Sequence, residues 1–255
     1  PGAPTGSASQ SFCSGDNPTV ADLAATGTSI QWYDAPTGGS LLSGATALAD
    51  ATTYYASQTV NTCESTSRLA VTATVNATPG APTGSASQSF CSGDNPTVAD
   101  LVATGTTIQW YSVPSGGTPL SGATALADAT TYYASQTVNT CESTSRLAVT
   151  ATVNATPGAP TGSASQSFCS GDNPTVANLV ATGNSIQWYS VPSGGSPLSG
   201  ATALADATTY YASQTVNTCE SISRLAVTAT VNATPGPPTG SASQSFCSGD
   251  NPTVA

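Results

Sequence analysis

The stretch RLAVTATVNATPGAPTG (residues 68–84) contains the two signals that decide the fold. Its first part alternates between apolar and small polar side chains, and the apolar face consists of Leu69, Val71, Ala73 and Val75. A period of two predicts a strand with one buried face. The second part, residues 76–84, has two prolines and two glycines in nine residues. That composition predicts a short, fairly stiff connector.

The rest of the unit also shows strand patterns. SIQWYD (29–34) alternates, with Trp32 on the face opposite Tyr33, and TTYYASQTV (52–60) is rich in β-branched and aromatic residues. Turn-forming residues separate these stretches, and only TVADL (19–23) has the spacing of a single helical turn. Six or seven short strands with frequent turns predict an all-β fold, a small β-sandwich.

The sequence repeats with a period of 78 residues. Three series share that spacing: Trp32, Trp110, Trp188; Cys13, Cys91, Cys169, Cys247; and Cys63, Cys141, Cys219. Most solenoid repeats are shorter, roughly 20–50 residues, so this period predicts a tandem array of small domains. We expect domains at 1–78, 79–156 and 157–234, and the start of a fourth, truncated repeat at 235–255. That last segment is too short to form an independent domain.

The copies are nearly identical. Repeats 1 and 2 differ at seven positions and repeats 2 and 3 at five, and six of the first seven differences lie between residues 29 and 41. No single copy therefore holds a unique site. The 29–41 stretch would host a ligand if each repeat bound one, and would otherwise be the least constrained surface.

The charge balance excludes several function classes. The chain has three Arg, no Lys, no His and thirteen acidic residues, which gives a net charge of −10. Binding to nucleic acid or to an anionic membrane surface requires cationic groups, so we expect neither. No apolar run is long enough to span a membrane. We also expect both ends of the sequence to be cuts in a longer polypeptide that carries its export signals elsewhere.

Seven cysteines in a polar chain without lysine indicate an oxidising, extracytoplasmic setting. Small domains commonly need such covalent staples, which favours disulfides over buried thiols. Two cysteines per repeat without histidine cannot complete a tetrahedral zinc site.

Other candidate sites have a simpler structural interpretation. We predict that Trp32, Trp110 and Trp188 anchor the cores, and that Tyr33, on the opposite face, is exposed. Asp16, Asp22, Asp34 and Asp50 match no known calcium-loop spacing, and we assign them to turns and caps. The chain lacks His and Lys for acid–base or Schiff-base chemistry. We therefore expect no catalytic residues, no cofactor and no metal, and infer that the protein is not an enzyme.

The combination of QWY, TYYASQTVN and CES within each repeat resembles immunoglobulin-like tandem repeats of very large Bacteroidota surface proteins. The resemblance covers each full repeat, from Phe12 to Asn76 in the first. Proteins of that family are similar to type IX secretion substrates and gliding-motility adhesins. The resemblance implies immunoglobulin-like sandwiches in an extracellular or cell-surface protein.

The pairing of the cysteines has two readings. Pairing within repeats gives Cys13–Cys63, Cys91–Cys141 and Cys169–Cys219, and leaves Cys247 unpaired by truncation. In a standard seven-strand immunoglobulin sandwich, however, the positions of Cys13 and Cys63 lie at opposite poles. The alternative, Cys63–Cys91, requires the chain to reverse within residues 76–84. We favour pairing within repeats because the connector has the composition of a spacer between self-contained units.

These observations predict a structural role, in which the array forms part of a long extracellular fibre or surface adhesin. Further repeats of the same chain, and neighbouring fibre chains, are the expected partners. The alternative is a binding module in which each repeat holds a surface glycan or protein weakly and the array supplies avidity. No sequence feature names that ligand.

Overall fold

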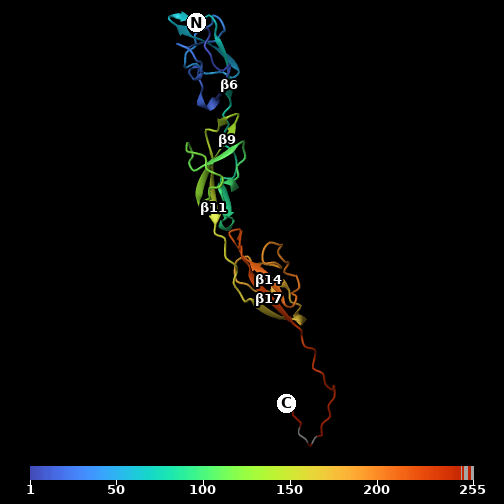
Figure 1. The fold of residues 1–255 in the computed structure, drawn as a ribbon. Coiled ribbons are helices and arrows are strands. Elements are labelled where there is room, and N and C mark those ends of the chain that lie inside the picture. Colours follow the sequence, from blue (N-terminus) through green and yellow to red (C-terminus); the bar gives the residue numbers. More distant parts are fainter. Residues whose placement is uncertain (248, 250–251, 254–255) are drawn as a thin grey trace. The chain divides into compact units, whose positions relative to one another are not determined.

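The computed structural model describes residues 1–255 except 248, 250–251 and 254–255. The described chain contains strands and single 3-10 turns and no α-helix. It divides into two compact units, residues 1–154 and residues 155–255. The first unit holds two copies of one sheet, and the second holds a third copy (Figure 1). The predicted all-β fold of three repeated sheets is confirmed.

Repeats 1 and 3 are each built on a four-stranded sheet, and repeat 2 on a five-stranded sheet that also includes a strand of its hairpin. In the first repeat the strand order is β1-β6-β3-β2, which comprises β1 (Ser9–Cys13), β6 (Leu69–Asn76), β3 (Thr52–Ser57) and β2 (Gln31–Tyr33). Neighbours pair antiparallel except β1 and β6, which run parallel, from Ser9 opposite Thr72 to Cys13 opposite Asn76. The chain thus reaches Cys13 at the same end of the sheet where β6 leaves it.

A short hairpin extends from the opposite end of this sheet. It pairs β4 (Thr59–Val60) with β5 (Cys63–Glu64). The two residues between them, Asn61 and Thr62, both have positive φ, 48° and 66°. Two left-handed residues in a row make the type I′ turn whose twist matches that of a hairpin. Cys63, which directly follows these two residues, therefore lies next to the tip of the hairpin.

The second layer of the domain is mostly irregular. It contains two single-turn 3-10 segments, Ser14–Asp16 and Val20–Asp22, and isolated bridges that join Thr5 to Thr26 and Thr19 to Ala47. This layer covers one face of the sheet. The buried residues between the layers are Val20, Leu23, Trp32, Leu48, Tyr54, Ala56, Val71 and Ala73.

The other two repeats follow the same plan. The strands of repeat 2 are β7 (Ser87–Cys91), β8 (Ile108–Tyr111), β9 (Thr130–Val138), β10 (Cys141–Glu142) and β11 (Leu147–Asn154). Those of repeat 3 are β12 (Ser165–Cys169), β13 (Gln187–Tyr189), β14 (Thr208–Ser213), β15 (Thr215–Val216), β16 (Cys219–Glu220) and β17 (Leu225–Asn232). Their 3-10 turns are Ser92–Asp94, Val98–Asp100, Ser170–Asp172 and Val176–Asn178.

The alternating patterns place the core as expected. Val71 and Ala73 are fully buried on β6, and the other face of that strand is partly or fully open. The tryptophans Trp32, Trp110 and Trp188 each lie within the buried cluster of their own repeat. The single turn at TVADL is present as a 3-10 turn. In the described part of 235–255, no strand forms.

Candidate functional site: the disulfide junction between repeats 1 and 2

The chain leaves repeat 1 beside Cys13. This cysteine ends β1 opposite Asn76, and the next turn holds the outgoing connector. Thr78 donates its backbone N–H to the Ser14 hydroxyl at 3.0 Å, and its own hydroxyl accepts from the Gly15 N–H at 2.7 Å. The first residues of the connector are therefore fixed to repeat 1.

The chain arrives at repeat 2 beside the hairpin that carries Cys141. Gln136, on β9, donates its side-chain N–H to the carbonyl of Gly80 at 2.8 Å. Cys141 pairs with Val138 across the same hairpin. Only Pro79 separates the connector residue held by repeat 1, Thr78, from the one held by repeat 2.

A disulfide crosses this short span and joins Cys13 to Cys141. Their Cα atoms are 5.5 Å apart, within the range that a disulfide requires. The sulfur of Cys141 lies 3.9 Å from the carbonyl oxygen of Phe12 and 4.0 Å from that of Asn76. Cys141 is fully buried at this junction. Repeats 1 and 2 are thus linked twice, by the connector and by the disulfide.

This bond corrects the predicted pairing within repeats. Cys13–Cys63 does not form, because Cys13 is bonded to Cys141 and Cys63 is a free, exposed thiol. Cys13 lies at the end of β6, whereas Cys63 precedes its start at Leu69. Seven residue steps along a strand cover about 23 Å, far more than the roughly 7 Å limit for bonded Cα atoms.

The other two predicted pairs are also wrong. Cys91–Cys141 is excluded because Cys141 is already bonded, and Cys169–Cys219 because Cys169 is a free thiol. Cys91 and Cys219 are each disulfide-bonded. Cys247 is free, as expected. The alternative Cys63–Cys91 also does not form, since Cys63 is free.

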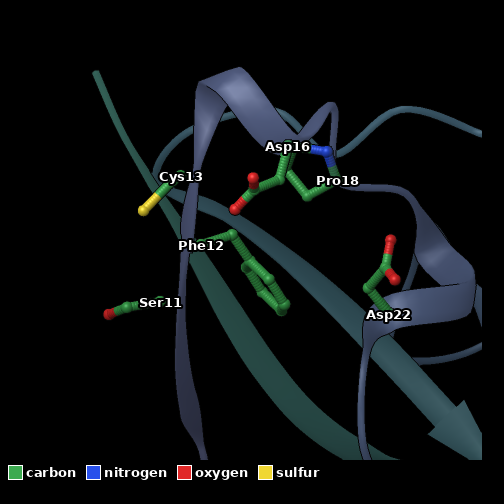
Figure 2. Close-up of a pocket in the computed structure, with 6 residues that line it drawn as sticks. All are labelled: Ser11, Phe12, Cys13, Asp16, Pro18 and Asp22. Carbon is green, nitrogen blue, oxygen red and sulfur yellow. The ribbon is translucent and has the colours of Figure 1, made fainter. Parts of the chain in front are cut away.

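A shallow hollow of about 400 Å³ lies beside Cys13, lined by Ser11, Phe12, Cys13, Asp16, Pro18 and Asp22. Figure 2 shows the Phe12 ring pointing to the side on which Asp22 lies, while Ser11 and Cys13 point the other way. The carboxylate of Asp22 is already engaged, because it accepts from the N–H of Thr19 at 2.7 Å and from its hydroxyl at 3.0 Å.

Asp22 caps a 3-10 turn and Asp34 closes a turn, as the sequence predicted, whereas Asp50 holds a residue of β6. Asp34 accepts from the N–H of Ser40 at 2.7 Å, and Asp50 from that of Val75 at 2.9 Å. In repeat 3, Asn178 replaces the capping aspartate and accepts from the Thr175 N–H at the same 2.7 Å. The amide oxygen of Asn178 can therefore replace the aspartate carboxylate as the hydrogen-bond acceptor of this cap. Among the described residues, no three His, Cys, Asp or Glu side chains gather as metal ligands.

The single arginine of each repeat fixes the stretch that varies between copies. Arg68 donates to the carbonyls of Ala35 and Gly38, both at 2.7 Å. Its guanidinium also stacks on the Tyr33 ring, 3.4 Å from the centroid. Tyr33 is partly buried under this arginine, so the expectation of an exposed tyrosine is wrong. Sequence reasoning missed this role of Arg68, which no local motif signals.

In repeat 2 the same arginine belongs to a larger cluster. Arg146 stacks on Tyr111 at 3.3 Å and lies 3.8 Å from the Glu142 carboxylate. The Tyr111 hydroxyl donates to Glu142 at 2.8 Å. Burial raises the pKa of Tyr111 above its usual value, and the bond to Glu142 raises it further. Tyr111 therefore stays protonated and keeps donating. The cluster ties β8 to the hairpin that carries Cys141.

The sheet, the core and the junction together define a tandem array of disulfide-linked immunoglobulin-like domains. No helix among the described residues is long and apolar enough to cross a membrane. The family described as "Ig-like domain CHU_C associated" matches residues 1–77, 79–155 and 157–233. The chain belongs to this family. A search of curated proteins found no match.

The family match fixes the class of the protein. Three tandem copies of an immunoglobulin-like domain are typical of surface proteins, and such domains are generally non-catalytic. The disulfide and the family together indicate an extracytoplasmic location. The CHU_C association links the family to Bacteroidota surface proteins.

Proposed function

We propose that this chain is a structural segment of a long extracellular fibre or surface stalk. Its repeats supply length and carry tension, and they perform no catalysis. The observation that supports this most strongly is the double link between repeats 1 and 2, through the connector and through Cys13–Cys141. A protein that only displays independent binding domains has no need to bond neighbouring domains covalently.

The surface composition also supports a stalk. A polar, acidic chain with three Arg and no Lys offers few positive charges that attract other polymers. The nearly identical repeats provide length without adding a distinct site. These features suit a spacer that must hold another domain away from the cell.

The finer assignment rests on the family and on the resemblance of its motifs. We propose that the chain lies at a bacterial cell surface, that a type IX system secretes it, and that it belongs to a gliding-motility adhesin. Its partners are further repeats of the same chain and neighbouring fibre chains. A surface glycan or protein is the ligand in the competing proposal of a binding module.

Two measurements test the stalk. Limited proteolysis of intact cells that express the gene should remove the repeats, since a stalk is outside the cell; full protection would contradict the location. The full chain should also show no specific retention on a glycan array. As a matched control, residues 29–41 of repeat 1 would be replaced by the repeat 2 sequence. A specific signal that depends on this stretch would favour the binding module.

A further inference from the structure

We propose that the Cys13–Cys141 disulfide is a covalent bypass that carries tension past the folded bodies of repeats 1 and 2. The proposal rests on the stalk function given above. Tension that enters at Pro1 passes along β1 to Cys13, crosses to Cys141, and leaves through β11. Residues 14–140 lie outside this route, although they contain the whole core of repeat 1 and most of that of repeat 2.

The length of the bypass follows from the positions of the two cysteines. The route from Pro1 to Ala155 through the disulfide has 12 residue steps to Cys13 and 14 from Cys141, whereas the backbone route has 154. At about 3.5 Å per extended residue, these routes span ~90 Å and ~540 Å. The disulfide thus reduces the greatest possible extension about six-fold.

The short route is comparable with the folded length. The longest strand has eight residues in repeat 1 and nine in repeat 2, or about 26 and 30 Å, and two such bodies with a connector reach roughly 60–90 Å. When tension unfolds both repeats, the bonded segment therefore lengthens little. The unfolded chain remains a closed loop, and its ends stay where refolding can begin.

The direction of β1 in the sheet supports this route. β1 runs parallel to β6 over five residue pairs, from Ser9 opposite Thr72 to Cys13 opposite Asn76. Tension between Pro1 and the outgoing end of β6 therefore shears these pairs together instead of opening them one by one. At the end of the sheared strand, Cys13 transfers to Cys141 whatever tension the hydrogen bonds do not hold.

Reduction opens the bypass. A dithiol reductant gives two electrons to the Cys13–Cys141 bond, which breaks into two thiols while the reductant closes into a cyclic disulfide. The greatest extension of residues 1–155 then returns to that of the backbone. Because Cys141 is fully buried, we expect reduction to be slow in the folded array and faster once the junction opens under tension.

The test is force spectroscopy on the full chain. One attachment tag precedes Pro1, and a second is inserted after Ala155, which is exposed in the connector. The distance between the tags should reach no more than ~90 Å in the oxidised chain, and ~540 Å after treatment with a dithiol. The variant Cys13→Ser should extend to the longer value under both conditions. The control Cys63→Ser, which removes a free thiol, should behave as the unaltered chain.

Two results would overturn the bypass. One is an oxidised chain that extends to ~540 Å; the other is a Cys63→Ser chain that loses the short limit. Circular dichroism of Cys13→Ser before pulling separates loss of the bond from loss of the fold. A variant that has not folded would be replaced by Cys141→Ser, which breaks the same bond. The measurement is independent of the glycan array, so a ligand found there would refute the stalk and leave the bypass standing.

Discussion

At the scale of single residues, the few charged side chains of each repeat serve the fold. The carboxylate of Asp22 caps a 3-10 turn, and the guanidinium of Arg68 holds the 29–41 stretch through two backbone carbonyls. Asp34 and Asp50 likewise accept from backbone N–H groups of their own repeat. The copies therefore need little charge, and most of the surface is uncharged and polar.

Asp22→Ala should lower the thermal stability of repeat 1, and Asp22→Asn should preserve it at neutral pH, because Asn178 makes the same cap in repeat 3. The N–H of Thr19 lowers the pKa of Asp22, and its hydroxyl adds to this. A lowered pKa gives stability that is present above the unfolded value of 3.8 and is lost as the pH falls through the folded value.

Hydrogen exchange of the segment around Ala24, which distinguishes repeat 1 from the other copies, would measure this effect. Asp22→Asn should lack the part of the acid destabilisation that Asp22 contributes. An Asp22→Ala chain as stable as the unaltered one would refute the role of the cap.

Arg146→Ala should destabilise repeat 2 by about 2–4 kcal/mol. It removes two charged hydrogen bonds, to Val113 and Gly116, and a stack on Tyr111. The Arg146 side chain is only 9 % exposed, so water replaces these contacts poorly. The control Arg146→Lys keeps the positive charge but not the planar guanidinium group, and should lose less stability than Arg146→Ala.

Denaturant dependence of hydrogen exchange in residues 102–118, whose sequence is unique to repeat 2, would give both values. Equal stability of Arg146→Ala and the unaltered chain would show that the variable stretch does not need this anchor.

At the scale of elements, the pairing of β1 with β6 and the hairpin that ends at Cys141 determine the junction. The parallel pairing brings Cys13 to the outgoing pole, and the type I′ turn places Cys141 at the incoming pole of the next repeat. The hairpin has a cost, because Thr140 has a φ of 70°, where a β-branched residue is strained.

Thr140→Gly should therefore stabilise the hairpin, by about 1 kcal/mol, since glycine takes positive φ without a Cβ clash. The same change at Thr62, which has a φ of 66° in a hairpin whose cysteine is free, is the matched control for the turn alone. Thermal unfolding of the oxidised chains would measure both. Loss of stability at both positions would contradict the strained-turn account.

The sequence predicts the elements better than the junction. Alternation in residues 68–75 identifies β6, its buried face and the connector, because these properties are local. The partner of Cys13 depends on a register between residues about 63 positions apart, Cys13 opposite Asn76, which no local pattern states. The position of Cys13 and Cys63 at opposite poles of a standard immunoglobulin sandwich is the sequence-based argument against a bond within the repeat. The spacer-like composition of the connector outweighs that argument in the prediction, and the prediction is wrong.

At the scale of the whole molecule, the Cys13–Cys141 disulfide joins two repeats, and Cys63 and Cys169 are free, so no disulfide closes within a repeat. Of the seven cysteines, the structure leaves three free: Cys63, Cys169 and Cys247. The core of each repeat is therefore held by packing and hydrogen bonds alone. The Cys13–Cys141 bond lies where repeats 1 and 2 meet.

A thiol titration of the oxidised, denatured chain should find three free thiols, because Cys63, Cys169 and Cys247 have no bonded partner. Pairing within repeats would instead leave one, on Cys247. Prior alkylation of the folded chain should block all three, since each is exposed. A single free thiol in the denatured chain that was not alkylated would contradict the Cys13–Cys141 bond.

The most direct test of the junction is a disulfide map of the alkylated, unreduced chain. Trypsin can cut only after the three arginines, Arg68, Arg146 and Arg224, because the chain has no lysine. The Cys13–Cys141 bond predicts that peptide 1–68 stays joined to peptide 69–146 until reduction, and further cleavage after Asp16 and Glu64 should leave Cys13, not Cys63, in the joined pair. If the two peptides separate without reductant, each with its two cysteines bonded internally, the account of the junction is wrong.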